Sequence, residues 1–376
     1  MEPGLQSLLL CTDEAVVRVL RRVLSELEIG VEHCPDADSA VQKLTRQRFE
    51  AVIVDCSTRE LAAKILKGTR SSPVNRRAIT VAIIDSQSAL KGAFEIGAHF
   101  VLYKPISLER TKSSFRSVRA LMKRERRRHA RIPVEIPVEL HYENGSGKSS
   151  TVTADLGENG IAIKSAGPKL PSSFRVKFAL PGAADEIDCR GEVAWEGNQL
   201  QGIRFCDVSP QISEQLKSWI GRQLLGTDAA DEPPVTCKLT DLSLSACYLQ
   251  TESPFPMRTR LQLMMRVGEL KLQIEGIVRV MHPASGMGVE FLQHTASQQA
   301  RVQQFIQELV NTEGAVPDLQ VRPDTIDNSA AALTAERAGN GDPLLSLFHT
   351  KAEVPVEVFQ IELRKQRGMP QEVAVS

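Results

Sequence analysis

The sequence lacks a net charge, because 46 Lys and Arg residues balance 46 Asp and Glu residues. A binding site for phosphates or nucleic acid must therefore come from local clustering of charge. No apolar run approaches the roughly 18 residues that a membrane-spanning helix needs. The N-terminus carries acidic Glu2 and no basic leader, so we expect a cytoplasmic protein without a secretion signal.

Metal and catalytic motifs are also missing. The seven cysteines form no C-x-x-C pair, and no histidine lies at metal-ligand spacing from another ligand. We expect these cysteines to be small buried residues. The phosphate loop G-x-x-x-x-G-K-[ST], the dinucleotide fingerprint G-x-G-x-x-G and the esterase elbow G-x-S-x-G are absent. The enzyme classes that these motifs mark are excluded, and we expect neither catalysis nor a cofactor.

A length of 376 residues predicts two to three domains at roughly 150 residues each. The first part alternates short β-branched runs with amphipathic helical patterns, typical of a doubly wound parallel sheet. Ligand sites in such sheets lie at the carboxyl ends of the strands, where we find Asp13, Asp55 and Lys104. The predicted strands are 8–11, 51–55, 79–84 and 100–103, and the predicted helices include 38–48 and 89–96.

These positions make residues 1–122 resemble the receiver domain of two-component response regulators. The resemblance implies that Asp55 accepts a phosphoryl group, that Asp13 helps to hold Mg²⁺ and that Lys104 senses the phosphate. Two departures weaken the implied chemistry: Thr12 replaces one of two acids, and counting back 22 positions from Lys104 places Ala82 at a hydroxyl position. We therefore favour a receiver-like domain that is not phosphorylated, with doubtful Mg²⁺ binding.

A basic run, Lys123 to Arg131, follows with six Lys and Arg in nine residues. On its own such a run is typical of a solvated helix end or a general patch for polyanions. Short alternating segments at regular spacing come next and predict an antiparallel β-barrel. A helix at 211–224 closes this first β module, for which we expect the boundaries 123–224.

The first β module resembles the PilZ family of cyclic di-GMP receptors. The resemblance rests on Arg127-x-x-x-Arg131, on Asp155-Leu-Gly157-Glu-Asn-Gly160, and on Gly191-Glu-Val-Ala-Trp195 with Gly202-Ile-Arg-Phe205. It implies a ligand site in which the two arginines, in an extended segment, bind phosphates and guanines, and Asp155 accepts from guanine. Gly160 allows close approach of the backbone. Gly157 departs from the family, which has serine there.

Residues 225–312 repeat this module: Asp241 lies 86 residues after Asp155, as Gly288 does after Gly202. This copy has Ser243 in place of Gly157 but Ala246 in place of Gly160. Its leader, 226–234, is acidic and has no arginine pair. A dianion should be repelled there, so we expect a degenerate module with a structural or partner-binding role.

The tail, 313–376, should be mostly disordered, since 312–341 is rich in Ala, Asp, Asn, Pro and Gly. Two apolar patches, 342–349 and 354–363, are short enough to be tucked strands or a docking peptide. We favour docking on the chain's own body or on a partner.

The leading hypothesis is a cytoplasmic, non-catalytic signalling protein that binds cyclic di-GMP in the first β module and relays binding to a protein partner. The alternative is a phosphorylation-controlled response regulator whose β modules are only interaction scaffolds. A third hypothesis, nucleic-acid binding through the run from Lys123 to Arg131, is less favoured, since that charge is local.

Overall fold

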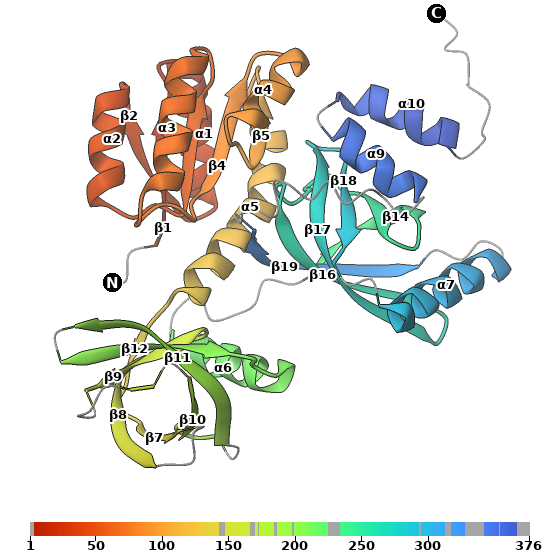
Figure 1. Ribbon diagram of the computed structural model, residues 1–376. Helices are drawn as coiled ribbons and strands as arrows, with labels where there is room; N and C mark the ends of the chain where they lie inside the picture. The colour runs from red at the N-terminus through yellow and green to blue at the C-terminus, as the bar shows by residue number, and fades with distance from the viewer. Residues whose placement is uncertain are drawn as a thin grey trace, which may run out of the picture. The chain divides into compact units, whose positions relative to one another are not determined.

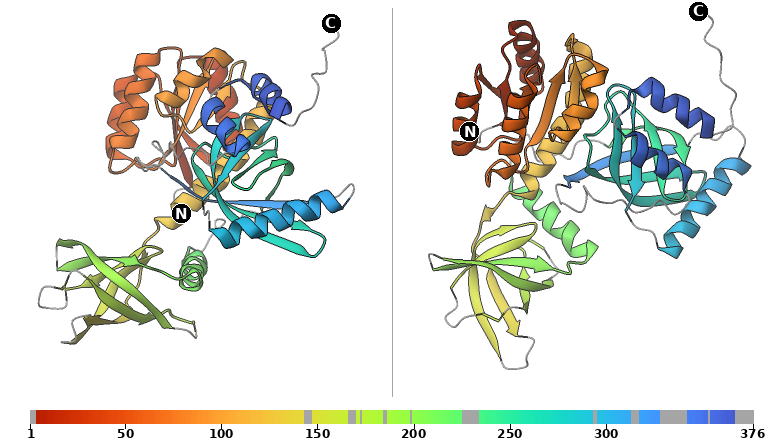
Figure 2. Two further views of the ribbon diagram at one scale, coloured as in Figure 1. Left: turned by 45° about the vertical axis from the view of Figure 1, so that its right-hand side comes forward. Right: turned by 45° about the horizontal axis from the view of Figure 1, so that its top comes forward.

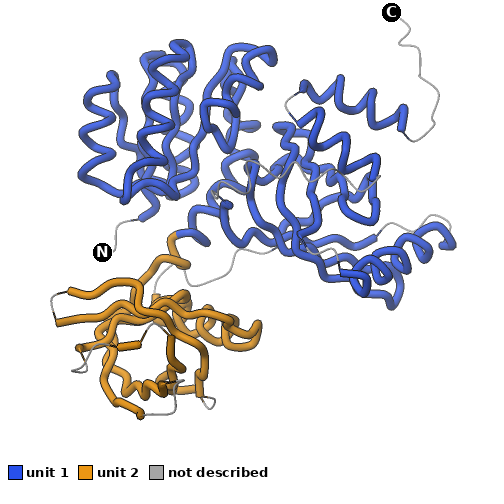
Figure 3. The backbone as a smooth tube through the Cα atoms, in the orientation of Figure 1, with its two compact units in different colours: residues 1–125, 233–376 blue, residues 126–232 orange. Residues whose placement is uncertain are grey.

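The computed structural model describes most of the chain, in two compact units (Figure 3). One unit comprises Met1–Glu125 and Pro233–Ser376, and the other comprises Arg126–Glu232. The described residues are 4–142, 147–165, 170–171, 173–183, 186–197, 199–224, 234–292, 295–312, 317–327, 342–352 and 354–366. The acidic leader 226–233 and the linker residues 328–341, on which the sequence made predictions, lie outside these ranges.

The first part of the chain is a five-stranded parallel sheet in the order β2-β1-β3-β4-β5 (Figure 1). This order is that of a doubly wound flavodoxin-like fold, which confirms the predicted fold class. Its strands are β1 (Leu5–Leu10), β2 (Ile29–Cys34), β3 (Ala51–Asp55), β4 (Ile79–Ile84) and β5 (Phe100–Tyr103). Its helices are α1 (Glu14–Glu26), α2 (Ala37–Arg46), α3 (Arg59–Ser71), the 3₁₀ turn η1 (Gln87–Ala89), α4 (Leu90–Glu95) and α5 (Leu108–Arg128).

The central strands are rich in apolar residues because they are covered on both faces. Every residue of β4 is buried, whereas β2, at the edge of the sheet, buries only its two terminal residues. Strand β2 could not be predicted from the sequence for this reason, since a half-exposed strand with Glu32 and His33 carries no continuous apolar run.

The first β module is a closed antiparallel barrel. Six strands form a ring in the order β8-β7-β10-β11-β12-β9, and β9 also pairs with β8. Burial alternates along β10, as expected for strands with one face inward. The strands are β6 (Ile132–Pro133), β7 (Pro137–Tyr142), β8 (Lys148–Gly157), β9 (Gly160–Lys164), β10 (Phe174–Ala179), β11 (Glu186–Gly197) and β12 (Leu200–Cys206), followed by α6 (Pro210–Gln223).

Helix α6 closes this barrel with one apolar face. Leu216, Trp219 and Ile220 are buried in the barrel core. The Trp219 indole N–H donates to the carbonyl oxygen of Pro181 at 3.0 Å. A buried indole nitrogen needs such a partner, so this bond fixes how the helix sits on the barrel.

The second β module is a seven-stranded antiparallel sheet in the order β13-β19-β16-β17-β18-β15-β14. Its elements are β13 (Val235–Thr236), β14 (Lys238–Leu242), β15 (Ala246–Gln250), β16 (Thr259–Val267), β17 (Leu270–His282), β18 (Gly286–Phe291), helix α7 (Ala296–Asn311) and β19 (Asp318–Ile326). The four strands β16, β17, β18 and β15 repeat the order of β10, β11, β12 and β9. The predicted repeat of two antiparallel β modules is therefore confirmed.

Strand β19 overturns the expectation of disorder for its residues. It pairs with β16, in the place that β7 holds beside β10 in the first module. In the second module this strand comes from the chain after α7. Leu319 and Val321 point inward and are fully buried. Pro323 and the flanking polar residues hid this alternation in the sequence.

The two apolar patches of the tail are helices, α9 (Pro343–Lys351) and α10 (Val356–Gln366), rather than strands. They lie beside the second sheet in all views (Figure 2). Leu344, Leu345 and Phe348 of α9 are buried. The tail thus docks on the chain's own body. In the described ranges no helix is both long and apolar enough to cross a membrane.

Helix α5 joins the receiver-like sheet to the second β module within one unit. The Ser117 hydroxyl donates to the carbonyl oxygen of Pro254 at 2.9 Å. Glu125 is only 5% exposed, and its carboxylate accepts from the Ile326 amide of β19 at 2.9 Å. Burying this carboxylate is tolerated because it is hydrogen-bonded.

Candidate functional site

The turn between β8 and β9 of the first barrel lies beside the segment that precedes the barrel. Strands β8 and β9 form a hairpin in which Gly157 pairs with Gly160. The short strand β6 pairs with β8, so that Pro133 lies opposite Asp155. The residues just before β6 are thereby held against the turn, which is where the basic run ends.

Arg131 and Asp155 form an ion pair at this point. The Arg131 Nε atom donates to Asp155 Oδ1 at 2.6 Å, and a second guanidinium nitrogen lies 2.6 Å from the same oxygen. The side chains are 42% and 30% exposed, so both charges remain reachable from solvent. Two residues that the sequence placed in one site, 24 positions apart, are thus brought together.

Arg127 lies in the last turn of α5, which ends at Arg128. The Ala130 amide closes that turn by donating to the Arg127 carbonyl at 3.0 Å. The expectation of an extended arginine segment is therefore wrong at Arg127. Lys, Arg and Glu are good helix formers, and no helix breaker occurs before Pro133, so the helix runs on through the basic residues.

The two turn glycines meet different neighbours. A side chain at Gly160 would overlap the carbonyl oxygen of Ile203 on β12. A Cβ atom at Gly157 would lie 3.1 Å from the Ala130 carbonyl oxygen and 3.5 Å from an Arg131 nitrogen. Gly160 therefore permits strand pairing, whereas Gly157 faces the arginine segment directly.

We expect Gly160→Ala to destabilise the first β module by about 1–3 kcal/mol, the usual cost of overpacking. Gly197→Ala is the matched control, because a Cβ there meets nothing within 4 Å, and it should change stability by less than about 0.5 kcal/mol. Thermal and urea denaturation of the two variants measure the difference. Equal stabilities would show that the contact with Ile203 does not constrain residue 160.

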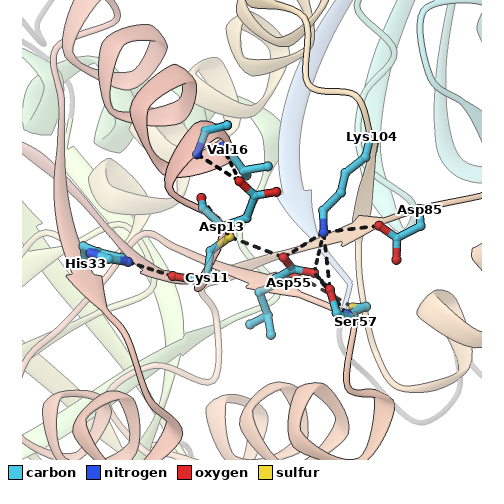
Figure 4. A network of polar contacts seen from close by, with 11 residues as sticks. Cys11, Asp13, Val16, His33, Asp55, Ser57, Asp85 and Lys104 are labelled. Atoms are coloured by element: carbon cyan, nitrogen blue, oxygen red, sulfur yellow. Dashed lines mark hydrogen bonds and ion pairs between the residues drawn. The ribbon is translucent and has the colours of Figure 1, made fainter.

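A second polar cluster lies at the carboxyl ends of β3, β4 and β5 (Figure 4). Lys104 Nζ contacts Asp55 at 2.9 Å and Asp85 at 3.2 Å. The Asp55 side chain is only 9% exposed. Burial raises the pKa of Asp55, but hydrogen bonds from Ser57 and Lys104 outweigh it and leave the pKa below its ordinary value. Asp55 is therefore a carboxylate at neutral pH, held by an internal cation.

Asp13 follows β1 at the carboxyl end of the sheet, as predicted from the sequence. Asp13 is the N-cap of α1, and its carboxylate accepts from the amides of Ala15 and Val16. Cys11 is the residue that contacts Asp55, with 3.3 Å between Sγ and Oδ2 (Figure 4). Burial raises the pKa of the Cys11 thiol to about 11, so it is neutral. The described residues contain no group of three or more His, Cys, Asp or Glu side chains that could hold a metal ion.

Ala82 is the residue that counting back from Lys104 gave for the hydroxyl group. Ala82 lies inside β4 and is fully buried, whereas Asp85 follows the strand and reaches Lys104. The position counted back from Lys104 thus falls inside the strand and not at its end. Asp85 directly follows an apolar strand, the same signal that marked Asp55, and that rule could have found it.

We expect Asp55 to hold no stable acyl phosphate. A phosphoryl group there would displace Lys104 from its ion pair with Asp55, Lys104 is also held by the carboxylate of Asp85, and the residue that contacts Asp55 from the end of β1 is the neutral thiol of Cys11. Incubation with acetyl phosphate and Mg²⁺, followed by intact-mass analysis, measures this. A mass gain that disappears in Asp55→Asn would contradict the expectation.

The turn of the second β module is closed on itself. The Ser243 hydroxyl donates to the carbonyl oxygen of Ala246 at 3.1 Å and accepts from the Ala246 amide at 3.0 Å. The Ser245 amide donates to Asp342 at 3.1 Å. Ser243, which stands where the first module has Gly157, thus makes its hydrogen bonds within the turn of the second module.

Comparisons with known proteins agree with this organisation. Residues 125–222 and residues 223–308 each match the family described as PilZ domain. A solved PilZ domain of CeSA from a cellulose-synthesizing bacterium is 26% identical and covers 24% of this chain and 94% of its own, with a TM-score of 0.21.

Receiver domains match the first part of the chain. That of a sensor histidine kinase from Pseudomonas aeruginosa PAO1 is 22% identical and covers 32% of this chain and 98% of its own, with a TM-score of 0.26. A CheY-like receiver domain from Methylobacillus flagellatus is 20% identical and covers 30% and 98%, with a TM-score of 0.27. None of the curated proteins compared with the chain matches it.

Proposed function

We propose that this chain, a receiver-like domain followed by two PilZ domains, binds cyclic di-GMP in the first of them and relays binding to a protein partner. The observation that carries the proposal is the ion pair of Arg131 with Asp155 beside the Gly157–Gly160 hairpin. Arg127, four residues earlier, completes the proposed site. The proposal includes no catalysis, and the cytoplasmic location stays a prediction.

The chemistry of these side chains suits the ligand. Cyclic di-GMP carries two phosphates and two guanines, and a guanidinium can pair with phosphate or with guanine O6 and N7 through two parallel bonds. Its planar face can also stack on a purine. The Asp155 carboxylate accepts hydrogen bonds, and guanine offers N1–H and N2–H donors. The arginines thus favour the charge of the ligand, and Asp155 favours its base.

Ligand binding must break the Arg131–Asp155 ion pair. An ion pair between partly exposed side chains contributes about 0–1 kcal/mol, and these two are 42% and 30% exposed. Hydrogen bonds to charged groups contribute about 1.5–3 kcal/mol each. Exchanging the internal pair for a phosphate on Arg131 and a guanine edge on Asp155 is therefore favourable on balance.

Control by phosphorylation, the alternative, has less support. Lys104 is engaged by both Asp55 and Asp85, and a neutral thiol contacts Asp55. We propose instead that the receiver-like domain serves as a platform, on which α5 and the second β module are fixed by buried hydrogen bonds such as that between Glu125 and Ile326.

Titration of fluorescently labelled cyclic di-GMP into the full chain tests the proposal. We expect saturable binding that unlabelled cyclic di-GMP displaces and cyclic di-AMP displaces at least tenfold more weakly. Absence of binding would refute the ligand assignment and would favour the scaffold alternative.

A further inference from the structure

The two β modules have corresponding surfaces around Gly202 and Gly288, and different groups cover these surfaces. In the first module Gly202 of β12 pairs with Ala162 of β9, next to the hairpin of the proposed site. In the second module Gly288 of β18 pairs with Tyr248 of β15. Both residues of the second pair lie 86 positions after those of the first. The outer surface around Gly288 is therefore the counterpart of the surface around Gly202.

Each glycine is covered by an aromatic ring, but the rings come from different places. Trp195, on the neighbouring strand β11, covers Gly202 and is itself 48% exposed. On strand β17 of the second module, the residue paired with Gly288 is Val280, which is smaller than Trp195. The ring over Gly288 belongs to Phe348 of α9, whose atoms lie 2.7–2.9 Å from the place of a Cβ on that glycine. A residue of α9 thus fills the space that the first module fills from its own sheet.

The helix pair α9–α10 buries a continuous apolar surface here. Phe359 of α10 stacks on Tyr248 with ring centroids 5.3 Å apart and lies 6.1 Å from the ring of Phe348. Its ring is also 4.8 Å from that of His282. The buried residues of the cluster are Ala246, Tyr248, Val280, Leu344, Leu345, Leu347, Phe348, Phe359 and Leu363. This surface is apolar and is covered by the two helices.

Polar anchors hold the start of α9 and the connection between α9 and α10. Asp342 caps α9 through Oδ1, and its Oδ2 accepts from the Ser245 amide at 3.1 Å. Ser245 is the counterpart of Asn159, in the hairpin turn of the first module. Burial lowers the pKa of His282 to about 4, so its ring is neutral. The Nε2–H can donate to the Val354 carbonyl oxygen at 3.2 Å while Nδ1 accepts from the Tyr248 hydroxyl at 3.0 Å.

We infer that the second β module is a helix-docking module, whose resident occupant is the chain's own α9–α10 pair. Its recognition elements are the Ser245 amide, which takes an acidic N-cap, and the Gly288 surface, which takes an aromatic ring six residues later. A nucleotide cannot reach this face while the helices cover it. The inference does not depend on ligand binding by the first module.

A labelled peptide of residues 342–366 tests the docking surface in trans. The full chain with Asp342→Ala and Phe348→Ala should bind the peptide at least tenfold more tightly than the wild-type chain, in which the tethered pair holds the surface. The same peptide with Phe348→Ala is the control and should bind neither chain. Equal peptide binding by both chains, or none by the variant, would overturn the inference.

Hydrogen exchange on a milder variant covers the case in which the double variant fails to fold. Serine is as good an N-cap as aspartate, but its shorter side chain cannot also reach Ser245. In Asp342→Ser the Ser245 amide should exchange at least tenfold faster, with the amides of β16 and β17 unchanged. An unchanged rate at Ser245 would show that Asp342 does not anchor the pair.

Discussion

Replacing both Arg127 and Arg131 with alanine is expected to abolish measurable cyclic di-GMP binding by the full chain. Each hydrogen bond from a charged donor contributes about 1.5–3 kcal/mol, so each single variant should weaken binding roughly tenfold to more than a hundredfold, at about 1.4 kcal/mol per factor of ten. Arg131→Ala should be the milder of the two, because wild-type Arg131 must first leave Asp155. Isothermal titration calorimetry measures all three variants.

Arg175→Ala is the matched control for loss of positive charge. Arg175 is 54% exposed and pairs with Asp188 at 2.8 Å in the same barrel, on strands β10 and β11 that do not pair with β8. Its removal should change affinity less than threefold. If the control weakened binding as much as Arg127→Ala, the arginines would be acting only through the general field of the barrel.

Asp155→Ala should remove much of the preference for guanine. Loss of a charged acceptor costs about 1.5–3 kcal/mol, so cyclic di-GMP should bind tenfold to a hundredfold more weakly. Cyclic di-AMP lacks the N1–H and N2–H donors, so its weaker binding should change little. The ratio of the two dissociation constants, measured by competition against one labelled ligand, gives the effect directly.

Asp188→Ala serves as the control for this change, since Asp188 is also paired with an arginine and is 32% exposed, against 30% for Asp155. It should leave the ratio of the two ligands unaltered. A fall in the affinity of both ligands by the same factor in Asp155→Ala would contradict a role in base recognition and would indicate that Asp155 only orients Arg131.

Much of the fold could be predicted from periodicity. The strands β1, β3, β4 and β5 are mostly apolar and largely buried, and the offset of 86 residues, as between Gly202 and Gly288, predicted a second β module. Strand β19 could not be predicted in this way, because its partner β16 lies more than fifty residues earlier in the chain and local periodicity does not report so distant a pairing.

Site residues that belong to one sequence motif could be predicted, whereas those placed by local structure could not. Arg131 and Asp155 were predicted together because both belong to one sequence motif, and the structure places them in contact. Arg127 was misjudged because helix α5 continues through the basic run, a matter of local propensity that the motif does not report. Cys11 and Asp85 were missed because a shift of one to three positions around a strand end changes which side chain reaches Asp55 or Lys104.

The central claim is that the first β module alone holds the ligand, at the junction of α5 with the Gly157–Gly160 hairpin. Hydrogen exchange of the full chain with and without saturating cyclic di-GMP tests it most directly. We predict slower exchange confined to residues 127–134 and 155–162, with residues 241–248 of the second module unchanged. Protection of 241–248, or a bound ligand that leaves 127–134 unprotected, would contradict the claim.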